Sequence, residues 1–330
     1  MIRIALDAMG GDFAPDEIVK GAVLASQELP DLEIFLVGSP DKIIQALKKH
    51  QEKGKLPIVT ASEVIGMNEH PVQAVKQKKD ASINVAVSLV KDGKADAVIS
   101  AGNTGAIMAA ALFKLGRIPG VERPAIATEF PLPTGKVLLL DMGANVDCKP
   151  KHLVQFAMMG RLYSQDVMRV ENPRVGLLNL GEEKEKGNEL TRETWPLLKQ
   201  AQVNFIGNVE SKEIFNGTVD VIVCDGFVGN LILKFGESLG TAIYKMMKKE
   251  LSGGIMNKLG LALLYPGLKR LKKLVTYDEY GAAPLLGIQG IVYKAHGRSK
   301  AAAIKTAIKN TAEAIKGDLI SSISKVSEKI

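Results

Sequence analysis

Residues Ser100–Ala106 have the sequence SAGNTGA, and the elements around them indicate how the chain folds. The apolar run Ala95–Ile99 precedes them and the apolar run Ile107–Leu115 follows, so a strand, a tight glycine turn and a helix are predicted. Glycine permits close backbone approach in such a turn, and the first amides of a helix lack acceptors within it. The stretch is therefore typical of an anion cradle, most often for phosphate, although an ordinary helix cap has the same pattern.

The candidate phosphate-binding residues of this turn are Gly102, Asn103, Thr104 and Gly105. The glycines would expose backbone amides, and Asn103 and Thr104 offer side-chain donors beside them.

Apolar runs and helical patterns alternate along the rest of the chain, which predicts a mostly parallel sheet with helical crossovers. The predicted strands are Ile2–Leu6, Leu32–Gly38, Leu56–Thr60, Ala95–Ile99, Ala125–Phe130, Val137–Leu140, Val175–Leu178, Val219–Val223 and Ile291–Lys294. Only 5% of the 330 residues are aromatic and 46% are hydrophobic, so Ala, Val, Ile and Leu must form the core, as in parallel α/β proteins.

The charge balance bears on partners. Lys and Arg outnumber Asp and Glu by 43 to 36, a net charge of +7. Such an excess favours acidic partners such as phosphorylated substrates, anionic lipid or an acidic protein, and a solvated surface explains it equally well. Nucleic acid is not an expected partner, because no aromatic-interleaved basic patch occurs.

Cys148 and Cys224 lie far apart without a CxxC pair, so free thiols in a reducing cytoplasm are expected. The first residues enter a strand pattern directly, and no apolar run reaches the length of a membrane span. We expect a soluble, cytoplasmic protein, which at most binds peripherally to the inner face of the membrane. No HExxH or other paired-ligand spacing occurs, so no metal is expected.

Polar residues and glycines follow two further strands. Asp7, Gly10 and Gly11 follow the first strand in DAMGGD, and Asp141 and Asn145 follow Val137–Leu140 in DMGAN. Because α/β sheets bind ligands at the carboxyl ends of their strands, these residues join the candidate phosphate site. The alternative is that they only build the turns.

The candidate catalytic residues are Lys184, Asp225, Asn230 and His296. Lys184 lies in the charged stretch LNLGEEKEKG, where it would neutralise an oxyanion or merely form solvated pairs. Asp225 and Asn230 belong to DGFVGN, a second strand–glycine–helix junction. On one sheet edge the two junctions could face each other across a cleft. His296 is the only histidine at a glycine-flanked strand end.

A helical excursion is expected at about 236–276, within an otherwise single domain over 1–330. Residues 251–275 place leucines at helical spacing with lysines and arginines mostly on other faces. Such a basic amphipathic segment suits either an anionic membrane or a subunit interface.

Seven ordered motifs over nearly the whole chain resemble the PlsX family of bacterial phosphate acyltransferases: DAMGGDFAP, SAGNTGA, DMGAN, LNLGEEKEKG, DGFVGN, YGAAPLLG and HGRS. Small variations occur at Ala282 and Arg298. The resemblance implies transfer of a fatty acyl group from acyl carrier protein to inorganic phosphate, giving acyl phosphate for phospholipid synthesis. It also implies a homodimer and a three-layer α/β/α fold related to isopropylmalate dehydrogenase and phosphotransacetylase.

Phosphate can attack a thioester directly, so neither a side-chain nucleophile nor a cofactor is expected, and the protein would position phosphate and stabilise the oxyanion. Asn230 and Lys184 would supply donors, and His296 or Asp225 would assist proton transfer. Two other functions stay open: a nucleotide-dependent dehydrogenase of the related fold, which lacks support because no GxGxxG fingerprint occurs, and a non-catalytic regulator that binds phosphate or carrier protein.

Overall fold

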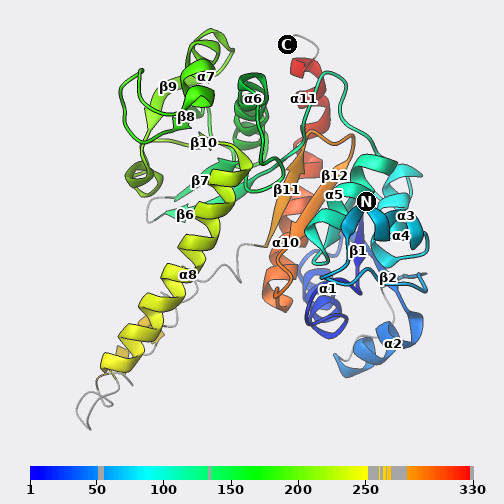
Figure 1. Cartoon of the computed structure of the whole chain (residues 1–330). Coiled ribbons are helices and arrows are strands. Elements are labelled where there is room, and N and C mark those ends of the chain that lie inside the picture. The colour runs from blue at the N-terminus through cyan, green and yellow to red at the C-terminus, as the bar shows by residue number, and fades with distance from the viewer. Residues whose placement is uncertain are drawn as a thin grey trace.

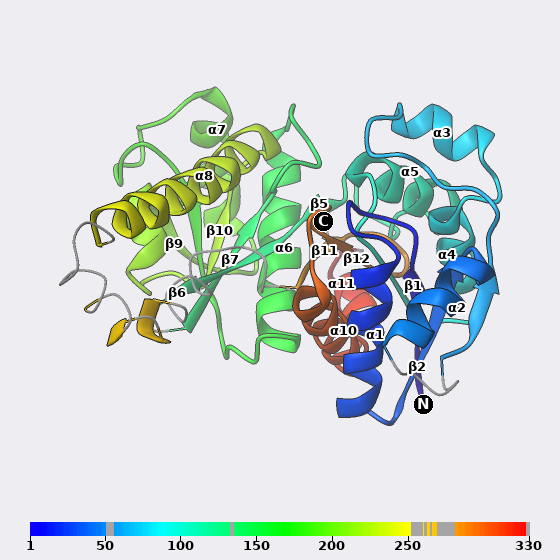
Figure 2. The ribbon, with the colours of Figure 1, turned by 90° about the horizontal axis from the view of Figure 1, so that it is seen from below.

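The computed structural model describes residues 1–50, 56–132, 135–251, 260, 263–264, 266–268 and 281–327. Their strands form two sheets that lie side by side, each with its own helices (Figure 1, Figure 2). The prediction of a mostly parallel α/β fold is confirmed, with the strands divided between two sheets.

The larger sheet has seven strands in the order β3-β2-β1-β4-β12-β11-β5. β11 is antiparallel to its neighbours β12 and β5, and the other pairs are parallel. The strands are β1 (Ile2–Asp7), β2 (Leu32–Gly38), β3 (Ile58–Thr60), β4 (Ala97–Ser100), β5 (Ala125–Ile126), β11 (Ala282–Leu286) and β12 (Ile291–Ala295).

Helices cover both faces of this sheet because its strands are apolar at successive positions. Ile4 and Leu6 of β1 share a buried cluster with α1 and α10, whereas Ala5 between them joins a second cluster with α4 and α5. Alternate side chains of a strand point to opposite faces, so the two clusters define three layers. The helices are α1 (Asp16–Glu28), α2 (Pro40–Lys49), α3 (Pro71–Gln77), α4 (Ser82–Lys91), α5 (Thr104–Lys114) and α10 (Ala301–Lys316).

The smaller sheet has five strands in the order β6-β7-β10-β8-β9, and only β6 is antiparallel to its neighbour. Helix α6 packs against β7, β8 and β10, and α8 packs against β7. The elements are β6 (Thr128–Leu132), β7 (Gly135–Leu140), α6 (Pro150–Asp166), β8 (Arg174–Leu178), α7 (Glu189–Gln200), β9 (Asn204–Val209), η1 (Ser211–Phe215), β10 (Val221–Val223), α8 (Gly226–Leu251) and α11 (Leu319–Ser327).

The chain passes from the larger to the smaller sheet at Ala127. The run Ala125–Phe130, predicted as one strand, is divided there, because β5 pairs with β11 and β6 pairs with β7. The N–H of Ile126 donates to Asp141 Oδ1 over 3.0 Å, and its carbonyl accepts from the N–H of Met142 over 2.9 Å. The turn after β7 thus hydrogen-bonds the N–H and carbonyl of Ile126, which a longer strand would pair with a neighbouring strand. The prediction of a single strand is therefore wrong.

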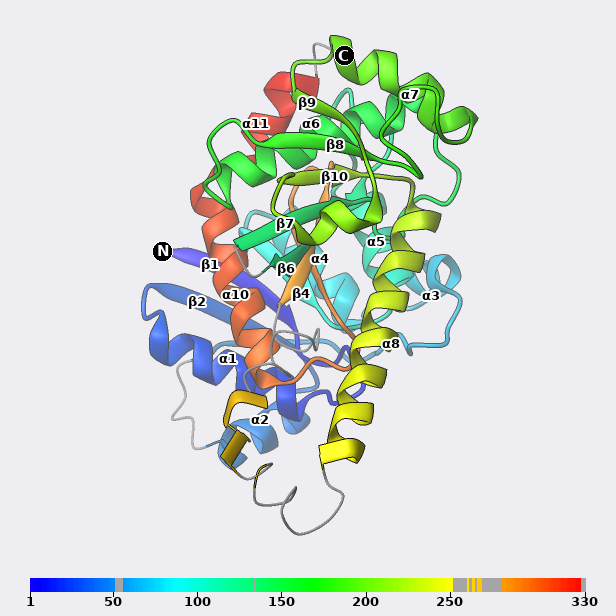
Figure 3. The same ribbon diagram turned by 90° about the vertical axis from the view of Figure 1, so that its left-hand side faces the viewer.

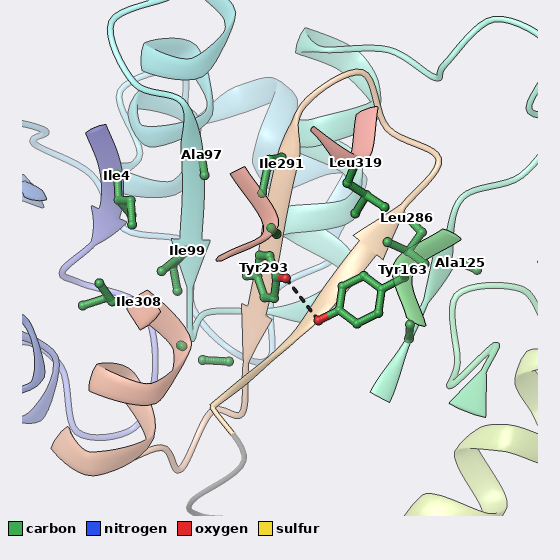
Figure 4. Close-up of a cluster of buried hydrophobic side chains, with 14 of the residues drawn as sticks. Ile4, Ala97, Ile99, Ala125, Tyr163, Leu286, Ile291, Tyr293, Ile308 and Leu319 are labelled. Carbon is green, nitrogen blue, oxygen red and sulfur yellow. Dashed lines mark hydrogen bonds between the residues drawn. The ribbon is translucent and has the colours of Figure 1, made fainter. Parts of the chain in front are cut away.

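The core is continuous between the two sheets. One buried cluster contains Leu138 and Leu140 of β7 as well as Ile4 and Leu6 of β1. Within it, Tyr163 of α6 points toward Tyr293 of β12, and their hydroxyl oxygens are 3.2 Å apart (Figure 4). The Tyr163 hydroxyl also donates to Glu129 Oε1 over 2.8 Å. Burial raises the pKa of both tyrosines, so both hydroxyls keep their protons.

Helix α8 begins beside the smaller sheet and then projects away from the body of the molecule (Figure 1, Figure 3). Its large apolar side chains recur at a spacing of three or four residues and are 44–65% exposed: Phe227, Leu231, Phe235, Leu239, Ile243 and Met246. The predicted excursion at about 236–276 includes the outer half of α8. Most of 251–275 lies outside the described residues. No helix within the described ranges is long and apolar enough to cross a membrane.

Candidate active site

The two halves of the molecule meet at a pocket of about 350 Å³. Three predicted site residues line it, each from a different motif: Thr104 of SAGNTGA, Asn230 of DGFVGN and His296 of HGRS. The remaining lining residues come from β5, β6, β11, β12, the turn after β7 and the first turns of α8: Ile126, Thr128, Met142, Gly143, Leu233, Lys234, Glu237, Ala283 and Lys294. A cleft between the two junctions therefore exists, but the prediction that both lie on one sheet edge is wrong: SAGNTGA follows β4 of the larger sheet and DGFVGN follows β10 of the smaller one.

Asp7 organises the turns at the ends of β1 and β4. It is buried, its Oδ2 accepts from the Ser100 hydroxyl over 2.7 Å, and its Oδ1 accepts from the N–H of Met9 over 3.2 Å. The Ser100 hydroxyl oxygen in turn accepts from the N–H of Gly102 over 3.0 Å. Burial raises the pKa of the Asp7 carboxyl, against the effect of its hydrogen bonds. Asp7 thus fixes the backbone of the SAGNTGA turn through the Ser100 hydroxyl.

Gly10 brings this turn against the cradle. A Cβ at Gly10 would lie 2.6 Å from Asp7 Oδ2 and 2.7 Å from the nitrogen of Gly102, so only glycine fits without displacement. Gly11 has a positive φ of 102°, and the next N–H, that of Asp12, donates to the carbonyl of Gly297 over 2.7 Å. These contacts tie DAMGGD, SAGNTGA and HGRS together and set His296 beside the cradle.

Asn103 is the N-cap of α5. Its Oδ1 accepts from the N–H of Ala106 over 3.1 Å, and its Nδ2 donates to the carbonyls of Met67 over 2.9 Å and Glu69 over 3.2 Å. Gly105 lies against the Pro71 ring, since a Cβ at Gly105 would be 2.7 Å from Pro71 Cγ. In this arrangement Asn103 holds the helix start and the loop before α3, while Thr104 faces the pocket.

Asp141 organises the second junction in a similar way. Its Oδ1 accepts from the N–H groups of Ile126 and Ala144 over 3.0 and 3.1 Å. Its Oδ2 accepts from the backbone N–H and Nδ2 of Asn145 over 2.7 and 2.9 Å, and Asn145 Nδ2 also donates to the carbonyl of Pro124 over 2.7 Å. Burial raises the pKa of Asp141. Asp141 and Asn145 thus build the turn that carries Gly143.

The start of α8 packs directly on this turn. A Cβ at Gly229 would lie 1.9 Å from the carbonyl oxygen of Asp141, and one at Gly226 would lie 2.8 Å from Asp141 Oδ2. Gly143, with a φ of 121°, lies against the side chain of Asn230. The glycines let the first turn of α8 approach close enough for Asn230 to enter the pocket.

Two predicted catalytic residues lie outside this pocket. Asp225 caps α8, with its Oδ1 accepting from the N–H of Val228 over 2.9 Å, and it lines a second, largely apolar pocket of about 310 Å³. Lys184 is exposed, and its Nζ lies 5.1 Å from the centre of the Trp195 ring. The structure therefore does not bring Asp225 or Lys184 together with Asn230 and His296.

Lys294 is a pocket residue that the sequence did not single out. It is half-buried near the end of β12, two residues before His296, and its Nζ donates to the carbonyl of Ala295. Burial lowers the pKa of Lys294 to about 8. The available signal was a lysine inside the apolar strand IVYKA, where a charge is unfavourable unless it has a use.

The chemistry of the pocket is that of a site for anions. It combines the ammonium groups of Lys234 and Lys294, against one carboxylate, that of Glu237, with an imidazole, an amide and the hydroxyl of Thr104 at the start of a helix. Across the described ranges, no group of three His, Cys, Asp or Glu side chains is placed to hold a metal ion.

Comparisons with known proteins place the chain in a family. The model of a family described as fatty acid synthesis protein matches residues 2–322. A phosphate acyltransferase of Desulfitobacterium hafniense (strain Y51) is 52% identical over 326 residues, which cover 98% of this chain and 97% of that protein. This chain belongs to that family. A phosphate acyltransferase of Thermosynechococcus vestitus is 53% identical over 316 residues, covering 95% of this chain and 92% of that protein. The resemblance to the phosphate acyltransferase family is confirmed.

Solved structures agree on the fold. A phosphotransacetylase from Streptococcus pyogenes has a TM-score of 0.63 at 17% identity and covers 96% of this chain and 94% of its own. A 4-hydroxythreonine-4-phosphate dehydrogenase from Klebsiella pneumoniae has a TM-score of 0.55 at 12% identity, covering 95% and 99%. Phosphotransacetylases and dehydrogenases thus share this architecture, so the fold alone does not distinguish them. The family membership assigns this chain to the phosphate acyltransferases.

Proposed function

We propose that this member of the phosphate acyltransferase family transfers a fatty acyl group from the thioester of acyl carrier protein to inorganic phosphate, giving acyl phosphate for phospholipid synthesis. The observation that carries the proposal is the meeting of Thr104, Asn230 and His296 in one pocket beside the start of α5. The family relationship supports the reaction, and the anion-binding chemistry of the pocket supports phosphate as the acceptor.

In the proposed reaction a phosphate oxygen attacks the thioester carbonyl carbon. A new C–O bond forms, the C–S bond breaks, and the thiolate leaves with one proton to become a thiol. No oxidant or reductant is needed. The protein has to hold phosphate near the carbonyl and stabilise the negative charge that develops on the carbonyl oxygen.

Each pocket residue is given a role in the proposed reaction according to its position. Phosphate is held at the amides of Thr104 and Gly105, the first of α5, with Thr104 and Asn230 as side-chain donors. His296 moves the proton to the leaving thiol. Asp7, Asn103, Asp141 and Asn145 act through the turns they build. Roles for Lys184 and Asp225 in the reaction stay predictions, which require a movement that brings them to the pocket.

Two protein partners are proposed, acyl carrier protein from the net charge and a second copy of the chain from the exposed side chains of α8. Acyl carrier protein is acidic, and the net charge of +7 favours its approach. The exposed apolar side chains of α8, from Phe227 to Met246, favour a contact with a second copy of the chain, because a monomer gains nothing by exposing them in a row. This supports the homodimer.

Membrane contact through residues 251–275 is proposed from the sequence alone. Replacing Leu268 and Leu271 by Glu should release the protein from anionic liposomes in a flotation assay. Retention on the liposomes together with loss of the dimer would assign the segment to the subunit interface.

The proposed activity is tested by incubating the protein with acyl carrier thioester and phosphate and measuring phosphate-dependent acyl phosphate. Asn230→Ala and His296→Gln should each lower the rate by about a hundredfold. Asn204→Ala, in β9 and remote from the pocket, is the matched control and should keep the full rate. Phosphate binding without turnover would instead favour the regulator, and reduction of a nicotinamide cofactor would favour the dehydrogenase.

A further inference from the structure

Lys294 lies at the functional edge of the larger sheet. In the register of the parallel strands it pairs with Ser100 of β4, which in turn pairs with Asp7 of β1. Paired residues of neighbouring strands point to the same face, so Lys294 lies in one row with the residues that build the SAGNTGA turn. It lines the pocket together with Thr104, Asn230 and His296.

The ammonium of Lys294 has no carboxylate partner within ion-pair distance in the described part of the chain. Glu129 shares a small adjoining cavity with it, but Glu129 already accepts from Tyr163 over 2.8 Å and from Lys136 over 2.6 Å. Asp12 acts on Lys294 only at longer range. A desolvated ammonium whose printed partner is one backbone carbonyl keeps an uncompensated charge, which destabilises a folded protein, so an anion supplied from outside is the expected compensation.

We propose that the Lys294 ammonium is the principal cationic ligand of phosphate in this pocket, acting beside the amides at the start of α5. This inference rests on the proposed function and names a residue for its acceptor site. Two independent features converge on it: Lys294, which has no carboxylate partner among the described residues, lines the pocket from β12, and the helix start reaches the same pocket through Thr104.

The other titratable groups near Lys294 affect its charge. They are Asp12 from the loop after β1, Glu129 from β6, His296 at the end of β12, and Lys234 and Glu237 from α8. Because burial lowers the pKa of Lys294 to about 8, the ammonium is present below that pH and is lost as the pH rises through it. The phosphate KM should therefore increase above about pH 8.

The first experiment measures thermal unfolding of the full chain with and without inorganic phosphate. Lys294→Met should raise the melting temperature without phosphate, because it removes an uncompensated charge, and should abolish the further rise that phosphate causes in the wild type. Lys114→Met is the matched control, because Lys114 ends α5 and its Nζ donates to the Ser88 hydroxyl of α4. The phosphate effect should persist in this variant. A lower melting temperature with an intact phosphate effect would mean a structural lysine and overturns the inference.

The second experiment measures steady-state kinetics of acyl phosphate formation. Lys294→Met should raise the phosphate KM by about ten- to a hundredfold, while the KM for the acyl donor stays unchanged. Lys294→Arg keeps the charge, so it should retain phosphate binding and lose the increase in KM above pH 8. A wild-type phosphate KM in Lys294→Met overturns the inference and leaves the proposed function intact. If the wild type forms no acyl phosphate, the proposed function fails, and the unfolding experiment still decides whether Lys294 binds phosphate.

Discussion

The turn after β4 and the turn after β10 are built alike, each around a buried aspartate from the neighbouring parallel strand. Asp7 lies beside the first turn and Asp141 beside the second, and in each case glycines allow the two loops to touch. Asn103 caps the helix of the first turn and Asp225 caps that of the second. The helices then differ: α5 has 11 residues with an apolar side in the core, whereas α8 has 26 and buries only three glycines.

The turns of the two junctions form the pocket, whereas the helices that follow them form different surfaces. Both turns need close backbone contact to bring a helix start to the pocket. The helix that follows can then serve another purpose, which for α5 is packing against α3 and α4 and for α8 is the display of apolar side chains outside the body.

The largest effect is expected where the backbone contact of the second turn is blocked. Gly229→Ala places a methyl group 1.9 Å from the carbonyl oxygen of Asp141, so it should destabilise the fold by about 3 kcal/mol, because a backbone atom cannot rotate away. Gly236→Ala is the matched control in the same helix, with open space around it, and should stabilise the protein by up to about 1 kcal/mol. Urea unfolding measures both, and equal midpoints would refute close packing of α8 on the turn.

A smaller effect should distinguish the two aspartates. Asp141 accepts four hydrogen bonds from N–H groups. In Asp141→Asn the new side-chain NH2 would face some of these N–H donors, so the free energy of unfolding should fall by about 2–3 kcal/mol. Asp7→Asn should cost less, because the Ser100 hydroxyl can reverse its hydrogen bond. Denaturant midpoints of the two variants test the order, and the reverse order would argue against Asp141 as the organiser of its turn.

The projecting helix should matter for association more than for folding. Ile243→Glu puts a charge among the exposed apolar side chains of α8 and should weaken self-association by about tenfold or more without lowering the unfolding midpoint of the monomer. Thr241→Glu adds the same charge on the other side of the helix and serves as the control. Sedimentation equilibrium reports the mass, and an unchanged dimer in Ile243→Glu would remove α8 from the interface.

The smallest effect is expected at the cap of α5. Asn103→Ala should cost about 1 kcal/mol in all, through the lost cap and the lost bonds to the carbonyls of Met67 and Glu69. Asn103→Asp keeps the cap acceptor and should recover part of the stability. If the alanine variant unfolds like the wild type while its phosphate KM rises, Asn103 binds phosphate directly and the capping role is secondary.

The sequence predicted most elements, because strand, glycine turn and helix start are local patterns. It placed the two junctions on one sheet edge, whereas they belong to different sheets and meet at the pocket between them. Apolar alternation could not reveal that Ala127 divides a run of six residues between two sheets, since that depends on which strand each half meets. Of the site residues, Thr104, Asn230 and His296 reach one pocket, whereas Asp225 and Lys184 lie elsewhere, because a strand-end motif fixes a turn and not the direction of each side chain. Lys294 was missed because it lies within a strand.

The crossing at Ala127 links the width of the pocket to the geometry of a single residue. Ile126 and Thr128 both line the pocket, and Ala127 between them is fully buried, with its N–H bonded to the carbonyl of Pro284 over 3.0 Å. Because Ile126 belongs to the larger sheet and Thr128 to the smaller one, the packing around this one buried residue sets the distance between the two walls of the pocket.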